Sequence, residues 1–118
     1  MSVKHIDEVP FEPVPDGVGV SKQVLIPASE APGFAMRCFT IQPGGSMPLH
    51  TNLVEHEQFV LEGSAKVVIG AESYLVGPGN VVFIPAGAAH TYLNTGSEPF
   101  RFLCLVPNKE DKTVIIPN

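Results

Sequence analysis

The chain has 118 residues, of which 44% are hydrophobic and 16% are charged, and this composition is that of one packed domain rather than a disordered segment. Its formal net charge of −5 argues against a nucleic-acid partner or an anionic membrane surface, because both favour a basic face. The apolar runs are only a few residues long, so we expect no segment to span a bilayer.

The first residues of the chain carry acidic side chains and prolines where a secretory signal would have an apolar core, and we therefore expect a cytoplasmic protein. Three prolines exclude a helix in this part of the chain, so residues 1–20 are expected to form an extended arm that lies on the domain or on a partner. Two cysteines, Cys38 and Cys104, cannot make a disulfide framework, and both are expected to be thiols.

Short apolar runs then alternate with turns rich in glycine and proline, and no segment has a sustained helical period. The predicted strands are residues 22–26, 34–41, 58–62, 65–69, 74–76, 81–84, 90–93, 100–106 and 113–116, with a turn expected at 43–48. Eight or nine short antiparallel strands favour a sandwich or a jelly-roll barrel. Since neither a repeat nor a linker interrupts the pattern, we expect a single domain over residues 1–118.

Three of the four histidines, His50, His56 and His90, lie at the ends of predicted strands. Residues i and i+2 of an extended chain share a face, so Asn52 is expected on the face of His50 and Gln58 on the face of His56. Three neutral imidazoles that converge inside a barrel suit a divalent transition metal and leave coordination positions open. Each histidine taken alone is better explained as a surface residue or a satisfied core residue; their joint spacing favours a metal site.

Two longer segments carry a family resemblance. Residues 44–63 resemble the first sequence motif of the cupin family, and residues 79–94, from Gly79 through Pro85 and His90 to Asn94, match its second motif at every signature position. The 15 residues between the two motifs are enough for one hairpin. The resemblance implies an all-β fold, the double-stranded β-helix (jelly-roll) barrel of cupins.

The run Glu55-His56-Glu57 is similar to that of small single-domain cupins of the quercetin-dioxygenase-like group, including a manganese-binding, four-histidine cupin from a thermophile. Carried over to this chain, the four ligand positions fall on His50, Asn52, His56 and His90. Histidine thus stands in place of the usual glutamate ligand, and an asparagine in place of a histidine. The carboxamide oxygen of Asn52 can ligate a metal but is a weaker donor than imidazole, so a site left empty is the alternative.

The resemblance implies a small-molecule cupin that binds manganese, iron, nickel or zinc and acts as a dioxygenase-like oxidoreductase. The alternatives are a cupin that binds a metal or small ligand without turnover, and a cupin isomerase, lyase or cyclase, because the same fold carries all these activities. No catalytic residue is assigned from the sequence; Gln58 and Cys104 are the candidates. Simple packing or hydrogen-bond satisfaction explains both equally well.

Other neighbours of the site have weaker signals. Phe39, Phe83, Tyr92 and Phe102 are expected to wall the cavity, and Arg37 is expected in a surface salt bridge, with a substrate anion as its alternative partner. Glu55 and Glu57 are expected at the rim. Outward-facing apolar residues, including Phe59, Leu61 and the segments 103–105 and 114–116, predict a homodimer.

Overall fold

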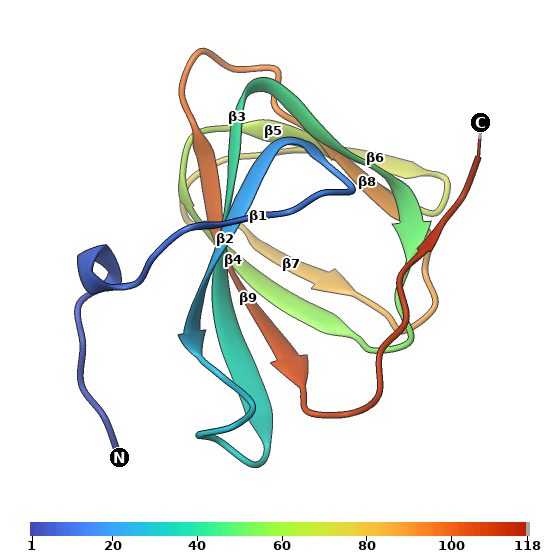
Figure 1. Cartoon of the computed structure of the whole chain (residues 1–118). Helices are drawn as coiled ribbons and strands as arrows, with labels where there is room; N and C mark the ends of the chain where they lie inside the picture. The colour runs from blue at the N-terminus through green and yellow to red at the C-terminus, as the bar shows by residue number, and fades with distance from the viewer. Residues whose placement is uncertain (118) are drawn as a thin grey trace.

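Ten antiparallel strands curl around one interior in the computed structural model, which describes residues 1–117 (Figure 1). A short 3-10 turn precedes them. The elements are η1 (Ile6–Glu8), β1 (Glu12–Pro13), β2 (Val18–Ile26), β3 (Phe34–Thr51), β4 (His56–Glu62), β5 (Ala65–Ile69), β6 (Glu72–Val76), β7 (Val81–Ile84), β8 (His90–Leu93), β9 (Phe100–Pro107) and β10 (Val114–Ile115). The all-β jelly-roll barrel predicted from the sequence is confirmed.

The long strand β3 connects the two sides of the barrel. Its first half pairs with β2 and β9, and its second half pairs with β8 and β10. From β3 the sheet continues through β8 and β5 to β6 on one side, and through β9 and β4 to β7 on the other. The interior therefore lies between two layers that share one strand.

The turn predicted at residues 43–48 is wrong, because β3 runs through it without interruption. Gly44 has a φ of 78°, which bends the strand in a conformation that other residues rarely adopt. The backbone at the bend stays paired, since the Gly44 N–H donates to Asn94 O at 3.1 Å and the Asn94 N–H donates to Gly45 O at 3.0 Å. The glycines and proline that indicate a turn in the sequence instead allow one strand to belong to both layers.

The core forms where the inner faces of the layers meet. Its buried apolar residues are Val20, Ile41, Val60, Ala65, Val67, Val76, Ile84, Tyr92, Phe100, Phe102 and Cys104. Cys38 and Cys104 are both buried and neither is in a disulfide, as predicted. In the part of the chain that the structure describes, no helix is long and apolar enough to cross a membrane.

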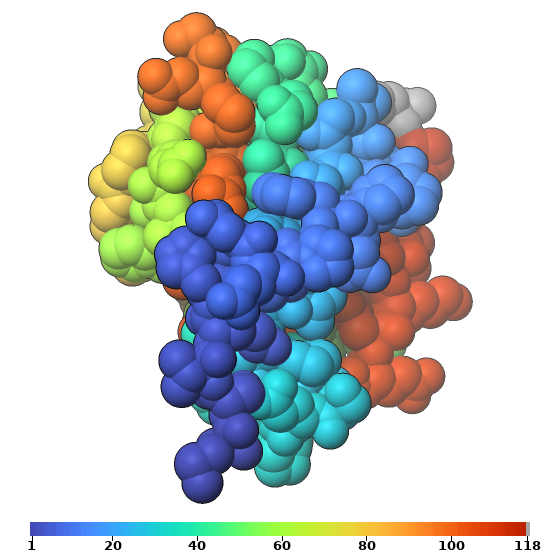
Figure 2. All heavy atoms as spheres, turned by 60° about the vertical axis from the view of Figure 1, so that its left-hand side comes forward, coloured from blue at the N-terminus to red at the C-terminus, as the bar shows by residue number. Residues whose placement is uncertain are grey.

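The N-terminal arm lies across the surface of the barrel (Figure 2). Its extended part is shorter than predicted, because η1 interrupts it and β2 already begins at Val18. Buried Gln23 anchors the arm by donating to Ile6 O and Val9 O, both at 3.0 Å. Its Oε1 accepts from Arg101 Nη2 at 3.0 Å, so one side chain joins the arm to β9.

Gly63 closes the first motif in a backbone conformation that only glycine adopts easily, with a φ of 75°. A Cβ at Gly63 would collide with the Pro99 carbonyl oxygen, whereas Gly70, with a φ of 59°, has no atom within 4 Å of such a Cβ. We predict that Gly70→Ala lowers the free energy of unfolding by about 1–2 kcal/mol through backbone strain alone. Gly63→Ala should cost roughly 1–3 kcal/mol more, because overpacking is added.

Urea unfolding of the two variants beside the unmodified protein measures both costs. Equal costs at the two positions would contradict the close approach of Gly63 to the Pro99 carbonyl oxygen, just before β9.

Candidate functional site

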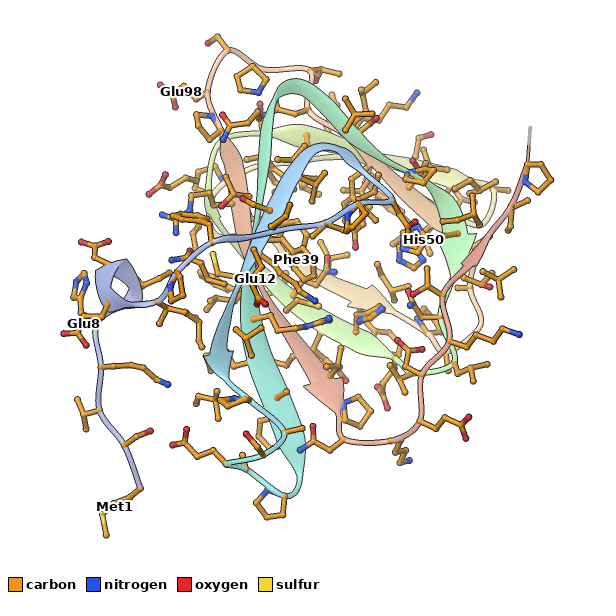
Figure 3. All side chains as sticks on the ribbon, in the orientation of Figure 1. Met1, Glu8, Glu12, Phe39, His50 and Glu98 are labelled. Atoms are coloured by element: carbon orange, nitrogen blue, oxygen red, sulfur yellow. The ribbon has the colours of Figure 1, made fainter. Side chains whose placement is uncertain are left out.

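A cavity of about 260 Å³ opens into the barrel between the two layers. Figure 3 shows His50 and Phe39 pointing into this interior from the two halves of β3. The structure brings together all six site residues predicted from the sequence, since the cavity is lined by His50, Asn52, His56, Gln58, His90 and Cys104, together with Lys22, Arg37, Phe39, Ile41, Met47, Tyr92, Phe102, Asp111, Thr113 and residues 13–16 of the arm.

His50 and His90 form the closest pair of rings in the cavity. They are register partners across β3 and β8, and their ring centroids are 4.1 Å apart. His50 Nδ1 lies 2.7 Å from Pro48 O, and His90 Nδ1 lies 2.9 Å from Ala88 O. Because a carbonyl oxygen only accepts, each Nδ1 carries the hydrogen and each Nε2 keeps a free lone pair. This is the tautomer in which metal-binding histidines are usually held.

His56 lies nearby, with its ring centroid 5.7 Å from that of His90, but its hydrogen bonds differ. Its Nε2 lies 3.1 Å from Asn52 Oδ1, and its Nδ1 lies 3.6 Å from Cys104 Sγ. In the tautomer that makes the Asn52 bond, Nε2 donates and Nδ1 accepts from the thiol. With the hydrogen on Nδ1 instead, Nε2 and Oδ1 would stand side by side as two lone-pair donors.

The C-terminal segment holds Asn52 in place, and the sequence did not predict this. Asn52 Nδ2 donates to Asp111 Oδ2 at 3.1 Å and to Thr113 Oγ1 at 2.9 Å. Since the carboxylate only accepts, the Asn52 carboxamide must turn its oxygen towards His56. The second carboxylate oxygen of Asp111 accepts from the Leu53 N–H at 2.8 Å. Pairing of β10 with the end of β3 brings these residues to the mouth of the barrel.

The site therefore contains a carboxylate that sequence reasoning missed. The only signal in the sequence was the weak strand pattern at 113–116, and alternation alone does not say which strand it pairs with. Asp111 accepts from the amide nitrogen of Asn52 and does not contact the imidazoles. It therefore orients the Asn52 oxygen as a possible metal donor and adds no carboxylate to the donor atoms.

The donor atoms fit a divalent transition metal in type, since imidazole nitrogens and one amide oxygen are suitable ligands. Within residues 1–117, however, no group of three or more His, Cys, Asp or Glu side chains is arranged so that it could hold a metal ion. The hydrogen bond that joins Nε2 of His56 to Asn52 leaves only His50 and His90 with free lone pairs. The metal site predicted from the sequence stays a prediction.

The two catalytic candidates lie on facing positions of β4 and β9. Buried Gln58 donates from Nε2 to Tyr92 Oη at 2.7 Å and to Cys104 Sγ at 3.6 Å. The alternation predicted for β4 is confirmed, because His56, Gln58 and Val60 are buried while their neighbours Glu57 and Phe59 face outward. Burial raises the pKa of Cys104, so the residue stays a neutral thiol.

Three expectations about neighbouring residues have different outcomes. Arg37 lines the cavity, and within residues 1–117 it takes part in none of the ion pairs, so its predicted surface salt bridge is wrong. The prediction that Phe83 walls the cavity is wrong. Phe83 faces outward and is 56% exposed, because it lies opposite the outward-facing Glu57. Glu55 and Glu57 are exposed and do not line the cavity, which fits the rim position predicted for them.

Burial lowers the pKa values of two of the histidines. Loss of solvation lowers the pKa of His56 to about 4, and the positive charge of Arg37 adds to this. Loss of solvation also lowers the pKa of His90 to about 4, although its hydrogen bond to Ala88 O acts in the opposite direction. Both imidazoles are therefore neutral at pH 7, which is the form that binds a metal or accepts a proton.

These shifts predict how the stability of the metal-free protein depends on pH. Above about pH 6.5 both histidines are neutral in the folded and unfolded chain. As the pH falls from 6.5 to about 4, the unfolded chain takes up protons that the folded chain does not. The free energy of unfolding should fall by up to about 3 kcal/mol for each histidine.

Urea unfolding in chelator between pH 5 and 6.5 isolates this effect, because most carboxylates titrate at lower pH. His90→Gln should make the slope shallower by nearly half, and His5→Ala, in the exposed arm, should leave it unchanged. A free energy of unfolding that is constant over this window would contradict the burial of neutral His56 and His90.

With the site described, comparison with known families identifies the class of protein. Residues 37–106 match the family model of the cupin domain (Cupin_2), and the chain therefore belongs to the cupin family. The match includes both predicted motifs, so the resemblance seen in the sequence is confirmed.

Two solved structures of other proteins are similar to this chain. The polyketide cyclase RemF from Streptomyces resistomycificus has a TM-score of 0.89 and 31% identity, over 100% of this chain and 88% of the cyclase. A predicted oxalate decarboxylase from Thermotoga maritima has a TM-score of 0.82 over 90% of this chain and 98% of its own, and at 21% identity it shares the fold alone.

Curated relatives are longer. The chain is 30% identical over 93 residues, or 79% of its length, to the 1-methylthio-D-xylulose 5-phosphate methylsulfurylase of Rhodospirillum rubrum, of which it spans 59%. It spans 16% of a mannose-1-phosphate guanylyltransferase of Escherichia coli, at 33% identity over 63% of this chain. These relatives support the domain family, and their names refer to different reactions.

Proposed function

We propose that the chain is a metal-dependent cupin enzyme that acts on a small, planar, enolisable molecule bound in the barrel. The observation that carries the proposal is the pair His50 and His90, whose Nδ1 atoms are held by backbone carbonyls so that both Nε2 lone pairs stay free in a walled cavity. His56 and Asn52 would complete the ligand set if the hydrogen of His56 moved from Nε2 to Nδ1, because this change frees both Nε2 and the Asn52 oxygen. A metal held there would act as a Lewis acid and carry its full charge, because no carboxylate is among these four residues.

The reaction class with the most support is a non-oxidative cyclisation. The support is similarity to RemF, described as a polyketide cyclase, over the full length of this chain. The cavity also suits such chemistry, since Tyr92 presents a hydroxyl that accepts from Gln58 and keeps its own hydrogen available to donate. Burial raises the pKa of Tyr92 well above its ordinary value, so this hydroxyl keeps its proton.

Oxygenation is the second candidate. It is favoured by the resemblance of the Glu55-His56-Glu57 run to quercetin-dioxygenase-like cupins. A donor set of imidazole nitrogens and one amide oxygen would also leave coordination positions open for oxygen and a chelating substrate. A cupin that binds a ligand without turnover is the remaining alternative.

One experiment distinguishes these three. Protein purified without added metal is first analysed for metal content, then loaded with manganese, iron, nickel or zinc and incubated with phenolic and 1,3-diketone substrates, with and without oxygen. Product formed equally without oxygen supports the cyclase. Product that requires oxygen, with matching oxygen uptake, supports the oxygenase instead. No turnover by any loaded form would contradict an enzyme and favour the binding protein.

The ligand set makes its own prediction. His50→Ala, His56→Ala and His90→Ala should each reduce metal affinity by more than the roughly 10–100-fold expected for loss of an outer-shell partner. Asn52→Ala should weaken affinity only about tenfold, and Asn52→His should strengthen it by restoring a fourth imidazole. Equilibrium dialysis with metal analysis measures each affinity.

His5→Ala is the control, because His5 lies in the exposed arm. Wild-type metal content in the His56 and His90 variants would rule out the site. No gain from Asn52→His would show that residue 52 is not directed at the metal.

We also propose that the chain forms a homodimer. Phe59, Val81 and Phe83 lie on neighbouring strands and are 45%, 76% and 56% exposed, which leaves an apolar face on β4 and β7. A second copy of the chain covering this face would give twice the 12.6 kDa mass of the monomer in light scattering. Phe59→Glu should halve that mass, whereas Val18→Glu on β2 should not; a wild-type mass near 12.6 kDa would exclude the dimer.

A further inference from the structure

Arg37 lines the cavity, and the contacts within residues 1–117 do not balance its charge. Its Nη2 donates to Cys104 Sγ at 3.3 Å, and its guanidinium carbon lies 4.9 Å from the centroid of the Phe39 ring. Its Nε is buried and has no hydrogen-bond partner within residues 1–117. A guanidinium has five N–H donors, so most of its hydrogen-bonding capacity is unused by these contacts.

No anion of the described chain neutralises this cation. Its hydrogen-bond partner within residues 1–117 is the sulfur atom of a cysteine rather than a carboxylate. Asp16 and Asp111 line the same cavity, but neither comes within 4.0 Å of Arg37 in the part of the chain that the structure describes. Asp111 is instead occupied by Asn52 and Leu53.

A half-buried cation without a counter-ion is unfavourable, because partial loss of hydration is not repaid by a partner charge. At a binding site, an anionic ligand balances such a charge and accepts hydrogen bonds from several of the free N–H groups at once. A carboxylate matches the planar fork of a guanidinium with two parallel hydrogen bonds.

The wall beside Arg37 is a stack of three aromatic rings. Phe39 and Phe102 stack with centroids 5.4 Å apart and an interplanar angle of 14°, and Tyr92 and Phe102 stack at 5.3 Å and 17°. All three rings line the cavity. Such a wall favours an aromatic group in the ligand, because a ring buries a large apolar area, packs favourably edge to face with other rings, and loses little conformational freedom.

The cavity volume limits the size of the ligand. At about 260 Å³ it exceeds the engineered cavity of about 150 Å³ that holds benzene, and lies just below the range of about 300–1,000 Å³ that holds drug-sized molecules. One or two fused rings with a short substituent fill such a space.

From these contacts we propose that Arg37 is the anion-binding residue of the cavity and that its ligand is a small aromatic carboxylic acid. The carboxylate pairs with the guanidinium, and the ring lies against Phe39, Phe102 and Tyr92. The sulfur atom of Cys104 contacts both the guanidinium and His56, so an acid bound at Arg37 lies in the same part of the cavity as His56. That this acid is the substrate rests on the proposed function; its binding to Arg37 does not.

Calorimetric titration with benzoate and with neutral, isosteric benzamide tests the proposal. The protein is kept in chelator, so that no metal contributes to binding. We expect benzoate to bind at least tenfold more tightly than benzamide. Arg37→Gln should weaken benzoate binding by about 10–100-fold, as expected for a lost hydrogen bond to a charged group, and should leave benzamide binding unchanged.

Two further variants make the test specific. Lys22→Gln removes another cation that lines the cavity and should change benzoate affinity less than threefold. Arg37→Lys keeps the charge without the planar fork and should recover only part of the affinity. It also serves as the test variant if Arg37→Gln does not give a cooperative unfolding transition.

Equal affinity for benzoate and benzamide would overturn the proposal, as would unchanged benzoate affinity in folded Arg37→Gln. Inorganic phosphate that competes as strongly as benzoate would overturn the aromatic part. The outcome is independent of the proposed function. Arg37-dependent benzoate binding by a protein that retains no metal supports the anion site and contradicts the metal-dependent enzyme. Metal retention without a preference for benzoate contradicts the anion site and leaves the metal-dependent enzyme supported.

Discussion

The bend of β3 at Gly44 and Gly45 decides where the functional side chains lie. Because the strand continues through the bend with its backbone paired to Asn94, it belongs to both layers. Its first half places Arg37 opposite Cys104 on β9, and its second half places His50 opposite His90 on β8. If the chain turned back at this point, the cation and the histidines would not share a cavity.

Backbone carbonyls then determine what the histidines can do. Pro48 and Ala88, each two residues before a histidine, accept from Nδ1 and leave Nε2 free. His56 lacks such a carbonyl and is held by Asn52 and Cys104 instead. The three imidazoles are thus not equivalent: two are fixed in one tautomer, while the third lies between an amide oxygen and a thiol, where the position of its proton decides whether it donates or accepts.

The cavity combines two kinds of wall. The histidines and the Asn52 carboxamide supply polar atoms, while Phe39, Phe102 and Tyr92 supply aromatic surface next to the charge of Arg37. Gln58 contacts Tyr92 and Cys104, and Cys104 contacts His56, so the two kinds of lining adjoin. The aromatic carboxylic acid that we propose as ligand would place its carboxylate at Arg37 and its ring against the aromatic lining.

The sequence by itself determined the barrel and the inward direction of His50, His56, His90, Gln58 and Cys104. These follow from local rules: the period of two along a strand, and the glycine and proline spacing of the two motifs, which sequence displays directly. Only the tertiary structure decided the rest. Asp111 reaches Asn52 because β10 pairs with the end of β3, and this register is not written in local spacing. Alternation places Arg37 on the face of Phe39, but its contact with Cys104 depends on the register of β3 with β9.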